Sequence, residues 1–186
     1  LSLSLSTAFL LKDYVQMEES TAGYVSTILD LGGTLGAILT GVASDTLYSG
    51  ASLHTAMHMC AATGLAFVFW AGACFMGATT LVHVLSIALI GFFIAGPGGV
   101  LGAAARGLVG YAGYGKDAAL ISATAGKLNG LASMGAVLQS LLAPQLVKYL
   151  GWPGLFAVLG VAMLSAAVVL RPAVAIEAAA LKKKKA

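Results

Sequence analysis

The chain has 186 residues, of which 59% are hydrophobic and only 9% are charged, whereas soluble domains carry about 25% charged residues. Residues 46–105 contain no Asp, Glu, Lys or Arg, and about 20 apolar residues are enough to span a bilayer as a helix. The composition therefore excludes a soluble globular protein and predicts an all-α integral membrane protein.

Six hydrophobic segments follow one another along the chain. The first, residues 1–11, reads LSLSLSTAFLL and is only about half a span long, so we expect it to be the last part of a truncated helix. Polar or Gly-rich loops separate the other five segments, which we expect to be complete spans. Their ranges are 21–44, 53–76, 81–104, 119–147 and 155–170.

The basic residues predict the orientation of these spans, because cytosolic loops of membrane proteins are enriched in Lys and Arg. One side of the predicted bundle carries Lys12 and Lys148, and the other side carries Arg106, Lys116, Arg171 and Lys182–Lys185. We therefore expect the loops at 45–52 and 105–117 and the C-terminus to be cytosolic. The chain then divides into a transmembrane bundle, residues 1–171, and a cytosolic basic tail, residues 172–186.

The basic tail also carries a candidate targeting signal. Lys183 and Lys184 stand fourth and third from the last residue, which resembles the dilysine retrieval signal of the endoplasmic reticulum. As a charge run, the same lysines would bind anionic lipid headgroups. We expect a multi-pass protein of the endoplasmic reticulum membrane with a cytosolic C-terminus.

Small residues recur along two of the predicted spans. Such residues let helix backbones approach closely in lipid, where no hydrophobic effect drives helices together. The pattern predicts either static close packing or smooth faces along which helices slide. The residues are Gly32, Gly36, Thr40 and Ser44 on one span, and Ser122, Gly126, Gly130 and Ser133 on the other.

The stretch DLGGTLGAILTGVASD, residues 30–45, contains two carboxylates in different settings. Asp30 lies inside a span, where a carboxylate is costly unless it faces protein or water, so it is either a substrate-path residue or a side chain near the membrane surface. Asp45 follows the end of the same span. There it could accept N–H groups at the start of a neighbouring helix and latch two helices, or it could be a solvated loop acid.

Lys127 and Asn129 lie within the span at 119–147. An ammonium group at that depth needs an anion or a wet cavity, unless the side chain extends to the membrane surface. The two residues point to different faces of a helix, because each residue turns the chain by about 100°. Since the charge is the costlier group to bury, Lys127 is the candidate we favour for a substrate path.

The sequence GPGG, Gly96–Gly99, interrupts the predicted span at 81–104. Proline removes a backbone donor and clashes with the preceding helical turn, so we expect a kink there. Interrupted helices in transporters often line the substrate path or move.

His54, His58 and His83 offer no third metal ligand nearby, and we interpret them, like Cys60 and Cys74, as structural.

Together these segments resemble the C-terminal half of a transporter of the major facilitator superfamily. GYVSTILDLGGTLGAILTGVASD resembles the eighth helix and its signature loop, G-x-x-x-D-[R/K], with Gly41 and Asp45 matching and Thr46 in place of the basic residue. FFIAGPGG, SATAGKLNGLASMGAVLQ and GWPGLF resemble the tenth to twelfth helices of the organophosphate:phosphate antiporters and sugar-phosphate exchangers.

This resemblance implies the C-terminal six-helix bundle of a twelve-helix transporter, with its first helix truncated. The full protein would exchange a phosphorylated small solute for inorganic phosphate by alternating access, and its partners would be the N-terminal six-helix half and the lipid bilayer. No enzyme activity, cofactor, metal or nucleic acid is expected. The alternatives are a transporter of another small solute, a non-transporting membrane sensor with this fold, and a truncated product or assembly subunit.

Overall fold

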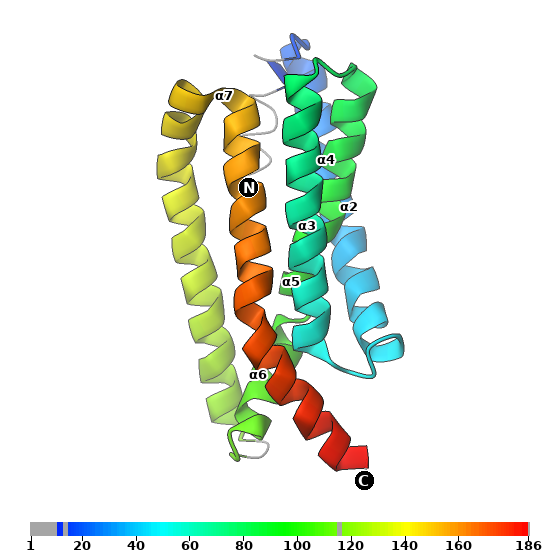
Figure 1. Ribbon diagram of the computed structural model, residues 1–186, viewed down its shortest axis with the longest axis vertical. Helices are drawn as coiled ribbons and strands as arrows, with labels where there is room; N and C mark the ends of the chain where they lie inside the picture. The colour runs from blue at the N-terminus through cyan, green and yellow to red at the C-terminus, as the bar shows by residue number, and fades with distance from the viewer. Residues whose placement is uncertain (1–10, 13–14, 115–116, 186) are drawn as a thin grey trace.

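The computed structural model describes residues 11–12, 15–114 and 117–185, with the backbone alone described at residues 101 and 183–185. Within these ranges the chain is helical and contains no strand. The helices pack as an up-and-down bundle (Figure 1). They are α2 (Glu19–Thr46), α3 (Ser52–Phe75), α4 (Thr80–Ile94), α5 (Gly96–Gly99), α6 (Leu101–Tyr111) and α7 (Ala118–Lys185).

Helix α7 reverses direction at Gly151, so it forms two antiparallel arms (Figure 1). The φ angle of Gly151 is 69°, a left-handed conformation that glycine adopts without the steric cost of a Cβ. We call residues 118–150 the first arm and residues 152–185 the second arm. The upper end of the bundle contains Gly151 and the α3–α4 loop, and the lower end contains α6 and the α2–α3 loop.

Among the described residues, four helical stretches are long and apolar enough to cross a membrane: α2, α3, the run from α4 to α6, and α7. Each arm of α7 exceeds the roughly 20 residues that a spanning helix needs. The prediction of an all-helical membrane protein is therefore confirmed. The first hydrophobic segment, residues 1–11, lies outside the described residues except for Leu11.

The loop predicted at 105–117 is shorter than expected, because helix α6 extends to Tyr111. Residues 101–111 include several Ala and Leu, which favour a helix. Ala104, Ala105 and Val109 are also buried. This burial outweighs the helix-weakening effect of Gly107 and Gly110.

The predicted basic tail, residues 172–186, continues as part of the second arm as far as Lys185. The helix passes through Pro172 without a non-helical residue, and Glu177 in this stretch is buried. The described residues that follow Arg171 are therefore helical and packed in part, and their cytosolic location stays a prediction. The side chains of Lys183 and Lys184 lie outside the described residues.

The core is centred on α3, with buried side chains from α2, α4 and the second arm of α7 packed around it. The indole ring of Trp70 stacks on the Phe156 ring with a centroid distance of 4.0 Å, and the Phe67 ring stacks on Phe156 at 6.2 Å. Below these rings, Gly64 and Gly160 face each other, since a Cβ on either would lie 3.0 Å from the other's carbonyl oxygen. Two glycines thus allow the close approach of these helices.

Candidate functional site: transport path and helix clamps

Helix α2 packs on α4 and α5 through backbone contacts that require glycine. A Cβ added at Gly36 would overlap the Phe92 carbonyl, and one added at Gly91 would overlap the Leu29 carbonyl. Gly36, Thr40 and Ser44 of the small-residue series on α2 are buried, as expected for a helix interface in lipid. The contact brings the α2 backbone against the helix that contains the GPGG sequence.

The helix from Thr80 to Tyr111 is divided by that sequence. Gly96–Gly99 forms the short α5, and Ala95 and Val100 separate it from α4 and α6. Pro97 has no amide hydrogen, so the carbonyl four residues earlier lacks its usual donor. A Cβ at Gly99 would lie 2.8 Å from the Ala37 carbonyl oxygen, so the divided segment rests directly on α2.

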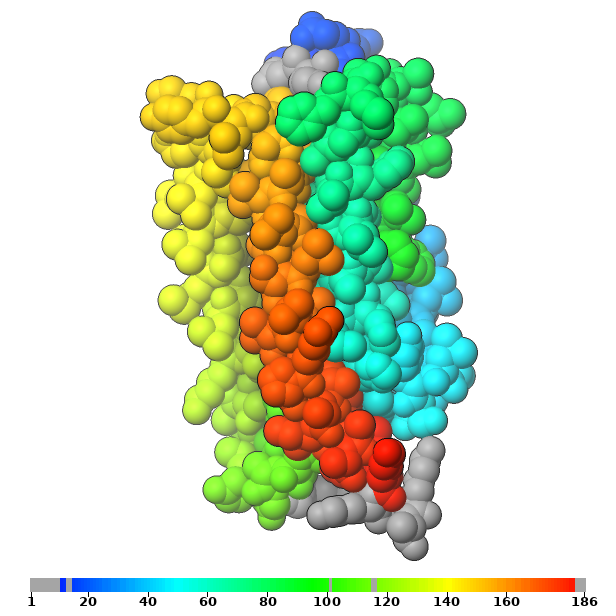
Figure 2. All heavy atoms as spheres, in the orientation of Figure 1, coloured from blue at the N-terminus to red at the C-terminus, as the bar shows by residue number. Residues whose placement is uncertain are grey.

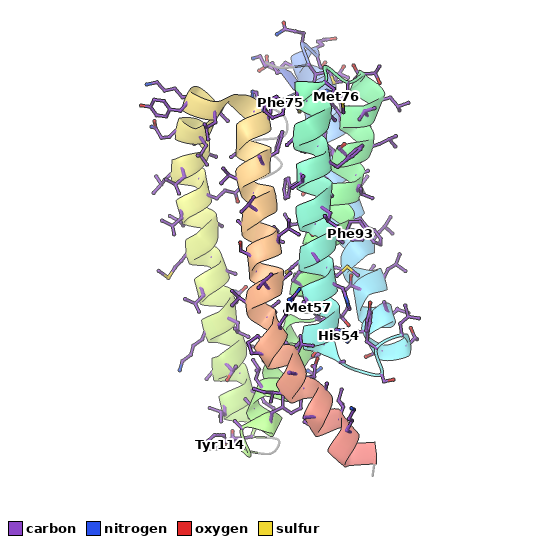
Figure 3. All side chains as sticks on the ribbon, in the orientation of Figure 1. His54, Met57, Phe75, Met76, Phe93 and Tyr114 are labelled. Atoms are coloured by element: carbon purple, nitrogen blue, oxygen red, sulfur yellow. The ribbon has the colours of Figure 1, made fainter. Side chains whose placement is uncertain are left out.

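A buried carboxylate joins three helices at the lower end of the bundle. Glu177, which is 1% exposed, accepts the backbone N–H of Leu53 at 3.1 Å and that of His54 at 2.9 Å. The Ser52 hydroxyl lies 3.4 Å from the same carboxylate, and the Tyr111 side chain at the end of α6 lies beside it. Figure 3 shows His54 at the lower end of α3. The carboxylate therefore caps α3, whose N-terminus favours a negative charge.

Asp45, predicted to latch two helices, lies exposed near the end of α2. Within the described part of the chain, no hydrogen bond or ion pair joins its carboxylate to another residue. Gly41, its partner in the predicted signature loop, has open space around its Cβ position. The capping arrangement expected of Asp45 is found at Glu177, and the latch role of Asp45 stays a prediction.

The first arm of α7 carries Lys127 and Asn129 on its exposed surface. This arm forms one edge of the molecule, yellow in Figure 2. Most of its side chains are exposed, and a Cβ at Gly126 or Gly130 would meet no atom within 4 Å. The second small-residue series therefore has no helix packed on it in the described structure.

Asp30 lies exposed on α2, and the Thr34 hydroxyl donates to its backbone carbonyl at 3.0 Å. Helix α2 packs chiefly on α4 and α5, whereas α7 packs chiefly on α3 and α6. The structure therefore does not bring Asp30 and Lys127 together as two sides of one site.

The three histidines occupy two different environments. His83 is buried, and its Nδ1 accepts the Trp70 indole N–H at 3.0 Å. His54 and His58 lie 4.5 Å apart between ring centroids, and Tyr48 contacts both rings. No group of three or more His, Cys, Asp or Glu residues gathers in the described ranges.

Two polar residues at helix contacts, Glu177 and Thr40, were not among the site residues predicted from the sequence. Glu177 is the single acidic residue after Asp117, and its place in an Ala-rich apolar run is a signal that could have identified it. Thr40 was counted among the small residues, but nothing in the sequence indicated that its hydroxyl lies beside the helix break.

These features define a multi-pass helical membrane protein whose helices contact one another through glycines and through hydrogen bonds of buried polar side chains. The chain is 31% identical over 159 residues to a protein named "Putative glycerol-3-phosphate transporter 4" from Arabidopsis thaliana. The aligned stretch is 85% of this chain but 28% of that relative, so the chain spans less than a third of the relative's length. No family model and no solved structure matches the chain. The similarity and the apolar helices suggest a transporter.

Proposed function

We propose that this chain is the C-terminal six-helix half of a major facilitator superfamily transporter that exchanges an organophosphate for inorganic phosphate. The observation that carries the proposal is the similarity to a named glycerol-3-phosphate transporter along 85% of the chain. The chain aligns with only part of that relative, which is consistent with its being one part of a larger transport unit. No bond is made or broken in the proposed reaction.

Lys127 supports a phosphorylated solute as the substrate. Its ammonium group is exposed on a helix long enough to span the membrane, and an exposed charge at that depth needs water or an anion. A phosphate dianion is such an anion, and a charged donor forms the stronger kind of hydrogen bond with it. Asn129, two residues away, and Asp30 on α2 are the further substrate-path candidates.

The glycine contacts between α2 and α4 and the break at Gly96–Gly99 support alternating access as the mechanism. Helices that meet through backbone atoms present smooth faces, and a divided helix can bend without unpacking its two ends. We place Gly41 and Asp45, in the last turns of α2, in a gating motif at the cytosolic end of this helix.

The orientation follows from the basic residues at the lower end of the bundle. Arg106, Arg171 and Lys182 belong to segments at this end, and the positive-inside rule then assigns it to the cytosol. With Lys183 and Lys184 as a retrieval signal, the protein would reside in the endoplasmic reticulum membrane.

The proposal is tested with full-length protein in proteoliposomes loaded with radioactive inorganic phosphate. External glycerol 3-phosphate or a sugar phosphate should trigger phosphate efflux, and the unphosphorylated alcohol or sugar should not. If neither phosphorylated solute triggers phosphate efflux, the exchange reaction is excluded. Uptake of another solute, or binding without transport, would then favour the alternative transporter or the membrane sensor.

A further inference from the structure

Thr40 on α2 has a buried hydroxyl that makes no hydrogen bond. The residue is 1% exposed, and no donor or acceptor in the described structure pairs with its Oγ1. Other helical threonines satisfy the same group locally: Thr34, Thr46 and Thr63 each donate to the carbonyl four residues earlier, at 2.8 to 3.0 Å. Thr40 has this option and does not use it.

The hydroxyl lies beside the divided helix. A Cβ at Gly96 would be 3.0 Å from Thr40 Oγ1, and the other neighbour of that position is the aliphatic part of Met59. Gly96 begins α5 and immediately precedes Pro97, which cannot donate to the helix. The unpaired donor therefore lies next to the segment in which the backbone hydrogen bonds of a helix are interrupted.

An unpaired buried hydroxyl costs free energy, and each such group in a folded protein needs an explanation. In this conformation, the Thr40 hydroxyl has no hydrogen-bond partner among the described residues. The group is explained if it gains a partner in a second conformation of the protein. The neighbouring segment can provide that partner, because carbonyl oxygens of a bent or unwound α5 lose their own donors.

We propose that Thr40 is a positioning residue for the divided helix, whose hydroxyl donates to a backbone carbonyl of the α4–α5 segment in a second, bent conformation. Gly98 can take part in such a change, since nothing lies within 4 Å of its Cβ position. The hydrogen bond stabilises the bent form relative to the form described above. The inference rests on the proposed function in one respect, namely that the bent form belongs to the transport cycle.

The test compares Thr40→Val with Thr63→Val in the full-length protein. Valine keeps the shape of threonine and removes the donor. Thr63 is the matched control because it is 0% exposed but donates to the Met59 carbonyl at 2.8 Å. Three quantities are measured: the thermal unfolding midpoint, amide hydrogen exchange of residues 95–101, and the rate of organophosphate–phosphate exchange.

For Thr40→Val we expect an unfolding midpoint equal to or above that of the wild type, because no hydrogen bond is lost in the resting form. Amide exchange at residues 95–101 should slow by about two- to tenfold, the ratio that one net hydrogen bond gives, because the bent form becomes rarer. The transport rate should fall by a similar factor, and Thr40→Ser should restore both. Thr63→Val should lower the midpoint and leave amide exchange at 95–101 and transport unchanged.

Two results would overturn the proposal. If Thr40→Val lowers the midpoint as much as Thr63→Val, the hydroxyl is already paired in the resting form; if amide exchange at 95–101 is unchanged, it does not influence the break. Should the valine variant not fold, Thr40→Ala must show the same slowing. If amide exchange slows in Thr40→Val but the wild-type protein does not exchange organophosphate for phosphate, the proposed function is rejected and the role of Thr40 in the bent conformation stands.

Discussion

The Glu177 carboxylate and the His54 backbone amide, 123 residues apart in the chain, form a 2.9 Å hydrogen bond at the lower end of the bundle. The same carboxylate accepts the Leu53 N–H through its other oxygen. The first N–H groups of a helix have no partner within the helix, so Glu177 satisfies two of them for α3. One side chain thus fixes the second arm of α7 to the start of α3.

Replacing Glu177 by alanine should destabilise the protein by about 2–4 kcal/mol, because two buried N–H groups would each lose their acceptor. Glu177→Gln should cost less, since the amide oxygen can still accept one of the two. The measurement is thermal unfolding of the purified protein in detergent, followed by size-exclusion chromatography. Glu19→Ala is the control, because that side chain is 81% exposed and forms an ion pair with the exposed Lys12. Equal unfolding midpoints for Glu177→Ala and Glu19→Ala would contradict the stabilising role of the Glu177 carboxylate.

Replacing Gly36 by alanine should separate α2 from α4, because the new Cβ would overlap the Phe92 backbone. The neighbour is backbone and cannot rotate away, so the cost should reach about 3 kcal/mol, the upper range for an overpacked core. Gly23→Ala is the control on the same helix, since nothing lies within 4 Å of that position. There, alanine should be neutral or slightly stabilising. The prediction fails if both variants have the same thermal midpoint.

Replacing Trp70 by phenylalanine should cost about 1–3 kcal/mol, because the buried Nδ1 of His83 would lose its donor. The ring stack on Phe156 is largely kept, so the loss reports the hydrogen bond more than the packing. Trp152→Phe is the control, because Trp152 belongs to the same aromatic cluster and has no hydrogen-bond partner among the described residues. A midpoint as low for Trp152→Phe would show that ring size, and not the hydrogen bond, decides the effect.

Replacing Lys127 by alanine should weaken binding of the phosphorylated solute by about tenfold or more, the loss expected for a charge-assisted hydrogen bond to phosphate. Lys127→Arg should retain part of the affinity because the positive charge remains. The measurement is the KM for organophosphate in the proteoliposome assay. Lys148→Ala is the control, since Lys148 is also exposed but lies near the Gly151 bend, over the Tyr149 ring. Unchanged KM in Lys127→Ala would remove Lys127 from the substrate path.

The sequence predicted the helical spans closely, because their signal is local. A run such as residues 53–76 is apolar throughout, and the structure has α3 at Ser52–Phe75. The predicted end of the span at 81–104 was wrong, since α6 continues to Tyr111. There the polar and Gly-rich residues indicated a loop, whereas burial of Ala105 and Val109 against other helices keeps the chain helical.

The sequence by itself determined that this protein is helical and belongs in a membrane, because hydrophobicity and length act residue by residue. It also indicated that glycines would mediate helix contacts, as Gly36 does. Only the tertiary structure decided which polar groups meet: Glu177 with the start of α3, Trp70 with His83, and the Thr40 hydroxyl with the break at Gly96. These relationships join residues far apart in the chain, and their energies depend on distance and burial, which a linear pattern does not contain.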